Sequence, residues 1–132
     1  MYEIKRLLPD STIFGVDISE YAIKNSKPEV QPLIKKCCAS EITQNFNYTF
    51  DLAYSINTLH CLEIEKMIKA IKGIESIANN KYICIESWRN EEEKANLMYW
   101  QVTCEAFHNV NSWKWIFEDL GYSGDYSFIF FE

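Results

Sequence analysis

The chain has 132 residues, of which 48% are hydrophobic and 15% aromatic, while only four are glycine and three proline. This composition predicts one globular domain over residues 1–132 with a substantial core, and it excludes disordered, collagen-like and linker-rich chains. The 19 acidic and 13 basic residues give a net charge of −6. Because an acidic chain does not attract a phosphate backbone, we expect no nucleic-acid partner.

Membrane and metal chemistry are also not expected. No apolar run approaches the roughly 18 residues of a membrane span, and the first ten residues lack the apolar core and small-residue cleavage site of a signal peptide. The five cysteines include no Cys-x-x-Cys pair, and most lie in apolar runs, where cysteine acts as a small hydrophobe. These features predict a cytoplasmic protein with no membrane partner, disulfide or metal site.

The first half of the chain predicts short strands and helices in alternation. Residues 2–8 have apolar side chains at helical spacing and stop at a proline, as at the end of a helix. The β-rich run 12–18 predicts a strand, and Ser19 is suited to cap a helix over about 20–26. Two further apolar runs predict strands over 33–39 and 50–56.

The second half begins with the clearest helix of the sequence, over 64–77. Its apolar side chains recur at steps of three and four, at Ile64, Met67, Ile68, Ile71, Ile74 and Ile77. An apolar strand is predicted next, over 81–87, and its last residues are polar.

The remaining elements are two helices and a final strand. A helix is predicted over 91–107, since three glutamates favour its first turn. Its apolar stripe consists of Leu97, Trp100, Cys104 and Phe107. Ser112 is suited to cap the next helix, which Gly121 ends, and a strand follows over 126–131. The aromatic side chains of residues 88–115 are interpreted either as a lid over a substrate or as core.

The order of these elements indicates an α/β fold. The strands are almost continuously apolar, which is typical of a buried parallel sheet, so we expect a doubly wound, mostly parallel sheet with helices on both faces. Ligands of such sheets bind beyond the carboxyl ends of the strands. Candidate site residues therefore lie at 17–18, 39–40, 55–57 and 86–87.

Asp17 is the first candidate for a binding residue. It ends a predicted strand and precedes a predicted helix. A carboxylate at this place is suited to accept both hydroxyl hydrogens of a ribose, which neither lysine nor serine can do in the same geometry. The alternative is that Asp17 only helps to cap the following helix.

Five segments in this order resemble the second half of class I S-adenosylmethionine-dependent methyltransferases. They are GVDIS, CCASEI, FDLAYSINTLHCLE, YICIESW and WIFEDLGY, and together they cover nearly the whole chain. The resemblance implies a Rossmann-like fold that binds S-adenosylmethionine. Asp17 would hold the ribose, and Cys38 stands where the family has an acid. The other implied contacts are Ile18, Ala39 and Ser40 for the adenine, and Asn57 and Leu59 beside the sulfonium.

The family's first strand and its Gly-rich loop have no counterpart in the sequence. The first glycine is Gly15, and the 16 residues before Asp17 are too few for a strand, a loop and a helix. In the family this strand lies between the second and fourth strands of the sheet. The resemblance thus implies an N-terminally truncated domain, in which the flanking strands close up, another chain supplies the missing strand, or the chain is a fragment.

Two residues are candidates for the chemistry of methyl transfer. His60 is placed to remove a proton from an acceptor, and Glu86 to orient an acceptor amine or hydroxyl. The simpler alternatives are a packed histidine and a hydrogen-bonded structural carboxylate.

The function implied is in-line transfer of a methyl group from S-adenosylmethionine to a small-molecule acceptor. Activity of this chain alone is not expected, because much of the cofactor's binding surface is missing. The alternative is a non-catalytic methyltransferase-like subunit or a self-associating module, in which a homodimer or a partner chain covers the exposed strand edges. A redox domain that binds a dinucleotide would share the ribose acid. It also requires a Gly-rich phosphate loop at the start of a helix, which the sequence lacks.

Overall fold

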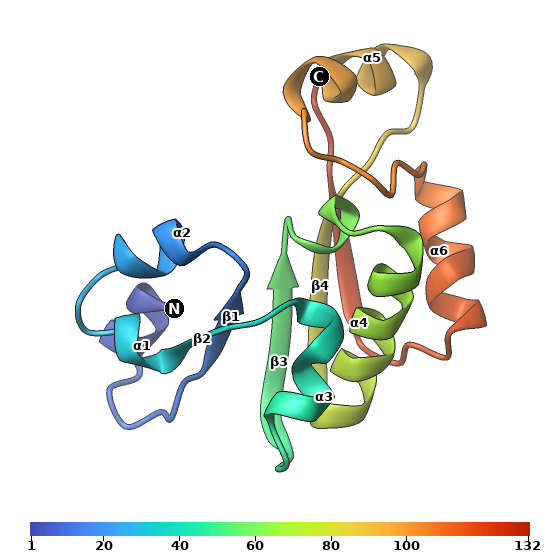
Figure 1. Ribbon diagram of the computed structural model, residues 1–132. Coiled ribbons are helices and arrows are strands. Elements are labelled where there is room, and N and C mark those ends of the chain that lie inside the picture. Colours follow the sequence, from blue (N-terminus) through green and yellow to red (C-terminus); the bar gives the residue numbers. More distant parts are fainter.

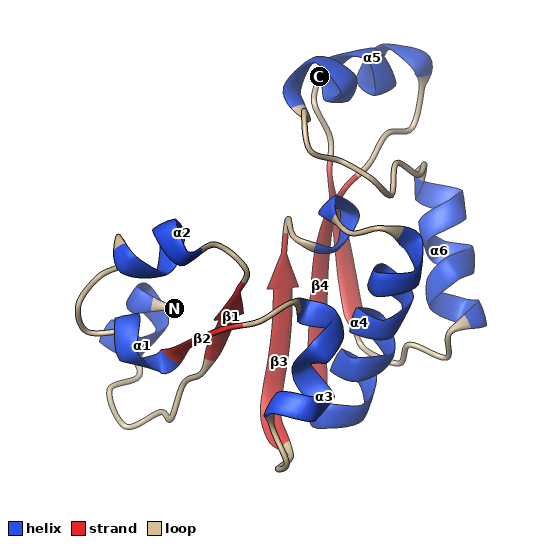
Figure 2. Ribbon diagram, viewed as in Figure 1, coloured by secondary structure: helices blue, strands red, loops and turns tan.

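The computed structural model describes residues 1–132, and its five strands form two separate sheets (Figures 1 and 2). β1 (Gly15–Asp17) pairs with β2 (Ile34–Lys36). β3 (Phe50–Ile56) pairs with β4 (Ala78–Glu86), which also pairs with β5 (Asp125–Ile129). Every pairing is parallel. An α/β fold with parallel strands is therefore confirmed.

Six helices accompany the two sheets. They are α1 (Tyr2–Leu7), α2 (Glu20–Lys24), α3 (Ile42–Asn45), α4 (Ile64–Ile77), α5 (Glu91–Trp100) and α6 (Val110–Asp119). In Figure 1, α1 and α2 lie with the two-stranded sheet, whereas α3, α4 and α6 flank the three-stranded sheet and α5 lies near the C-terminus. Short 3-10 turns occupy Gln31–Leu33, Ala39–Glu41 and Leu59–Cys61. No helix has the length and apolar character that crossing a membrane requires.

The helix ends follow from local hydrogen bonding. Ser19 caps α2 as predicted, because its Oγ accepts a hydrogen bond from the Ala22 N–H at 3.1 Å. The predicted cap of α6 at Ser112 is wrong. Asn109 caps this helix instead, since its extended backbone lets its Oδ1 accept from the Ser112 N–H at 2.9 Å. Gly121 adopts φ +67° and ends α6, as predicted.

The predicted helix over 91–107 is too long, because α5 ends at Trp100. Beyond it, the N–H groups of Glu105 and Ala106 both donate to the His60 carbonyl at 2.9 Å. This tertiary pairing replaces the hydrogen bonds that a continuing helix would make. Cys104 and Phe107 therefore do not share a helical stripe with Leu97.

The main core lies between α4, α6 and one face of the three-stranded sheet. It includes the buried side chains of Met67, Ile71, Ile83, Ile85, Trp113 and Phe117. Gly73 allows α3 to approach α4, because a Cβ at this position would lie 2.9 Å from Ile42 Cγ1. Ile64 shares the apolar periodicity of α4, but its side chain is 50% exposed, and the buried stripe begins at Met67.

The other face of the three-stranded sheet is open at β3. Side chains alternate along a strand, so Ala53 packs against the main core while its neighbours point away from it. The exposed fractions of Leu52, Tyr54 and Ile56 are 55%, 38% and 52%. One continuous, doubly wound sheet with helices on both faces thus stays a prediction.

Candidate functional site

The residues predicted to form a site all lie at or just beyond the carboxyl ends of strands. Asp17 is the last residue of β1, and Ala39 and Ser40 lie in the 3-10 turn that follows β2. Asn57 follows β3 directly, and Glu86 is the last residue of β4. Because the strands of each sheet are parallel, their carboxyl ends share an edge. The five positions are therefore distributed over two such edges.

Asp17 has one carboxylate oxygen engaged and one free. Oδ1 accepts a hydrogen bond from the Ser19 N–H at 2.7 Å, and the side chain is exposed. The structure thus shows the local capping contact, and it also leaves Oδ2 without a hydrogen-bond partner. Ile18, which is 66% exposed, presents an apolar surface beside it.

Cys38 directly precedes the turn after β2, where the resemblance to methyltransferases predicts an acid. Its Sγ accepts a hydrogen bond from the Ser40 Oγ at 3.1 Å. Ala39 is half-buried and lines the cavity described below. Of the two residues predicted to contact the adenine, Ala39 is accessible from the cavity, whereas the Ser40 hydroxyl already donates to Cys38.

The segment after β3 places its residues in opposite environments. Asn57 is exposed and adopts φ 51°, a left-handed conformation that asparagine tolerates better than most residues. Its N–H donates to the Cys84 carbonyl at 3.0 Å. Leu59 is 0% exposed and packs in the main core. The structure therefore leaves Asn57 available to a ligand but not Leu59.

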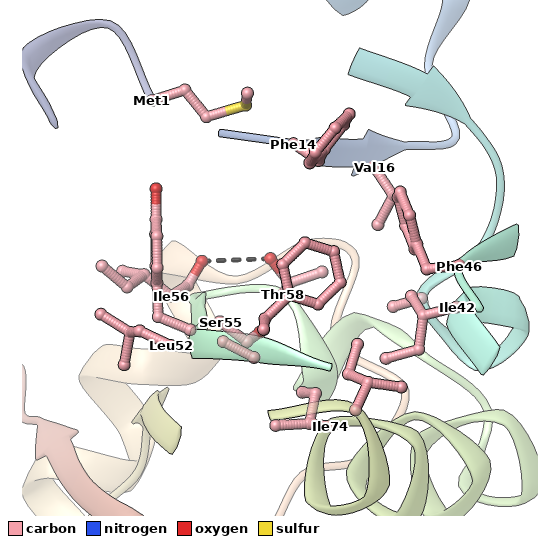
Figure 3. A pocket seen from close by; sticks show the side chains of 16 residues that line it. Met1, Phe14, Val16, Ile42, Phe46, Leu52, Ser55, Ile56, Thr58 and Ile74 are labelled. Atoms are coloured by element: carbon pink, nitrogen blue, oxygen red, sulfur yellow. Dashed lines mark hydrogen bonds between the residues drawn. The ribbon is translucent and has the colours of Figure 1, made fainter. Parts of the chain in front are cut away.

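A largely apolar cavity separates the two sheets, and we name it the inter-sheet cleft. Its volume is about 290 Å³, and 13 of its 16 lining residues are hydrophobic. Figure 3 shows Met1, Phe14 and Val16 on one side of it and Leu52 and Ile56 of β3 on the other. No residue of β2 lines the cleft, so β1 is the strand that faces β3 across it.

The strand order reverses at the inter-sheet cleft. From the cleft outward, the order is β1 then β2 in one sheet, and β3, β4, β5 in the other. In a single doubly wound sheet this order would mark a topological switch point, where open parallel sheets bind their ligands at the carboxyl ends of the strands. Ala39 and Thr58, which follow strands on opposite sides, both line the cleft. The Thr58 Oγ1 donates to the Ile56 carbonyl at 3.1 Å, the dashed line in Figure 3.

His60 and Glu86 meet in a buried cluster that includes Gln101. Their exposed fractions are 1% and 5%, and His60 Nε2 lies 3.5 Å from Glu86 Oε2. The Gln101 Nε2 donates to Glu86 Oε2 and lies 3.1 Å from His60 Nε2. Sequence reasoning missed Gln101, and no local signal marks it, because its place depends on the chain leaving the helix after Trp100. We call this group the His60–Glu86–Gln101 cluster.

Burial keeps His60 of this cluster and the nearby Cys104 uncharged at neutral pH. Burial lowers the pKa of His60, against the opposing effect of the Glu86 carboxylate, so the imidazole is neutral at pH 7. His60 Nδ1 is buried and has no hydrogen-bond partner. Burial, followed by the influence of Cys61 and Glu86, raises the pKa of Cys104 to about 11. The Cys104 thiol is therefore not a nucleophile at neutral pH.

The lowered pKa of His60 predicts a loss of stability in mild acid. Below pH of about 6.5 the unfolded chain binds a proton at this histidine that the folded chain does not, so the free energy of unfolding falls as the pH drops. The contribution of His60 between pH 7.5 and 5.5 is up to about 1.4 kcal/mol. Urea unfolding at both pH values measures it.

The matched variants are His60→Gln and His108→Gln, since burial also lowers the pKa of His108. We expect each substitution to flatten the pH dependence, and the effect at His60 to be the larger because its side chain is more deeply buried. An unchanged pH dependence in His60→Gln would contradict the assignment of a neutral, buried imidazole.

No group of three or more His, Cys, Asp or Glu side chains is arranged to hold a metal ion.

Comparison with known proteins adds no assignment to this site. The chain matches no family model, no curated protein and no solved structure.

Proposed function

We propose that the chain is a class I methyltransferase-like domain that binds S-adenosylmethionine at the switch point beside the inter-sheet cleft and serves transfer to a small-molecule acceptor. The single observation that supports this most is the reversal of strand order at the cleft. In this proposal the two sheets are halves of one doubly wound sheet.

The residues on the β1 side fit the nucleoside half of S-adenosylmethionine. Asp17 has an exposed, unpaired Oδ2 that can accept from a ribose hydroxyl, and Ile18 offers an exposed apolar contact for an adenine face. Ala39 begins the turn after β2 and lines the cleft. The methionine half finds fewer contacts, because Leu59 is buried and Asn57 is the exposed residue at that strand end.

S-adenosylmethionine, when bound, supplies a methyl group on a sulfonium sulfur, which needs alignment more than acid–base assistance. The chain's own contribution is to orient the ribose through Asp17. It also holds a neutral imidazole beside a carboxylate in the His60–Glu86–Gln101 cluster. The His60 side chain is 1% exposed, and Gln101 Nε2 lies 3.1 Å from its Nε2. An acceptor therefore reaches the imidazole only when neighbouring residues such as Gln101 move.

The test is calorimetric titration of S-adenosylmethionine and S-adenosylhomocysteine into the purified chain and two aspartate variants. Asp17→Ala should weaken binding at least tenfold, because a hydrogen bond to a charged group contributes about 1.5–3 kcal/mol. Asp51→Ala is the matched control, since Asp51 is an exposed carboxylate near the start of β3, away from the carboxyl ends of the strands.

Binding that only Asp17→Ala weakens would support the proposal. A folded chain that binds neither compound, or equal weakening in both variants, would overturn it and favour the non-catalytic alternative. The observation that favours this alternative is the open cleft, which has a strand with an unpaired edge on each side.

A further inference from the structure

The strands that border the inter-sheet cleft each have one unpaired edge. A strand directs its N–H and C=O groups to both sides, and β1 is paired only with β2, β3 only with β4. No backbone hydrogen bond joins residues 14–17 to residues 50–56. Each edge therefore presents a row of donors and acceptors to the cleft. Such rows are costly to leave unpaired in apolar surroundings.

The sequence of β3 is that of an interior strand. Natural edge strands are protected by lysine, proline, bulges or short length. β3 has seven residues, six of which pair with β4 in one constant register, and it contains neither lysine, proline nor glycine. Its only charged residue is Asp51, and the rest is apolar on both faces apart from Ser55. In the structure, however, it is an edge, with Leu52 and Ile56 more than half exposed.

We propose that the inter-sheet cleft is a docking site for one extended, apolar β-strand that a partner polypeptide supplies. The alternating partial charges of the two facing edges are complementary to a polypeptide backbone in extended conformation, which pairs with a row on each of its sides. The apolar lining accepts hydrophobic side chains from both faces of such a strand.

The occupant lies outside residues 1–132, because all five strands of the chain are already placed in the two sheets. Binding of this strand joins the sheets into one and removes both open edges. The inference does not depend on methyl transfer, so its test contains no methyl donor.

The probe is a synthetic peptide of seven residues in all, with a lysine at each end and alternating valine and isoleucine between them. The control peptide has the same sequence but carries N-methyl groups on alternate amides. Both have nearly the same apolar surface, but the second cannot donate hydrogen bonds along one edge. Amide hydrogen exchange of the full chain is followed by NMR. We expect the first peptide to slow exchange of alternate β3 amides at least tenfold and the second to have no such effect.

A pair of variants controls for the place of binding. Ile56→Lys puts a charge into the cleft, whereas Ile64→Lys changes a side chain of similar exposure on α4 that does not line it. The first substitution should abolish the slowing of exchange, and the second should leave it unchanged.

Three outcomes would overturn the proposal. The first is that both peptides act alike or neither acts. The second is that the chain is a dimer in which the β3 amides on the cleft side exchange slowly without peptide, so that a second copy fills the cleft. The third is a monomer with these amides already protected, which means that β1 and β3 have closed up.

Discussion

Replacing Trp113 by alanine will lower the free energy of unfolding by about 3–5 kcal/mol. Trp113 is 0% exposed and is one of the largest fully buried side chains of the chain. Its ring stacks with Phe117 at 5.9 Å between centroids and meets His108 edge-on at 5.3 Å. Phe117 in turn contacts Tyr126 of β5 at 4.8 Å. The indole is therefore part of the packing between α6 and the sheet, and its removal would leave a cavity there.

Two further tryptophan variants make this prediction specific. Trp115→Ala, on the same helix, should change stability by no more than about 0.5 kcal/mol, because Trp115 is 63% exposed. Trp113→Phe should cost less than about 1.5 kcal/mol. It loses volume but also removes the Trp113 Nε1 donor, which is buried without a hydrogen-bond partner. Urea unfolding measures all three, and equal effects of Trp113→Ala and Trp115→Ala would contradict the position of α6.

Replacing Glu86 by alanine will destabilise the protein by about 3 kcal/mol. The substitution leaves the Gln101 amide and the His60 ring without the carboxylate in a buried place, so that two polar groups lose a partner at once. Glu86→Gln should cost less, because its carbonyl oxygen still accepts from Gln101. Glu132→Ala is the surface control, since the Glu132 side chain is 79% exposed in its ion pair with Arg89.

The Glu86→Gln variant also makes a prediction about His60. The Glu86 charge opposes the effect of burial on the histidine, so its removal should lower the pKa of His60 further. NMR titration of the imidazole resonances measures this shift. A raised or unchanged pKa would show that the two side chains are not in contact.

Local patterns predicted the elements of this fold well. Each of the ten strands and helices expected from the sequence is present, and β3 and α4 have the expected bounds, 50–56 and 64–77. Their periodicity is strong and depends on neighbouring residues only. Helix ends were predicted correctly where the segment offers one suitable residue, as at Ser19 and Gly121. The start of α6 was missed because the segment offers two capping residues, and Asn109 rather than Ser112 caps the helix.

Features that depend on distant contacts could not be predicted in this way. The end of α5 at Trp100 follows from hydrogen bonds to the His60 carbonyl, some 40 residues earlier in the chain. The same departure from the helix brings Gln101 to Glu86 and His60, which the sequence had offered as separate candidates. The burial of Leu59 and the exposure of Ile64 likewise depend on how α4 packs.

Of the candidate site, the sequence located the strand ends but not their surroundings. Placing Asp17, Ala39, Asn57 and Glu86 at the ends of strands needed only the order of elements. The free oxygen of Asp17 and the engaged hydroxyl of Ser40 are properties of the folded turns.

The most direct test of the central claim is a map of amide chemical-shift changes as S-adenosylhomocysteine is added to the isotope-labelled chain. The proposed site predicts that the changes concentrate at Asp17–Ser19, at Ala39 and Ser40, and at Asn57 and Thr58, around the mouth of the inter-sheet cleft. Changes centred elsewhere, for example around Arg89 and Asn109, or no changes in a folded chain, would contradict it.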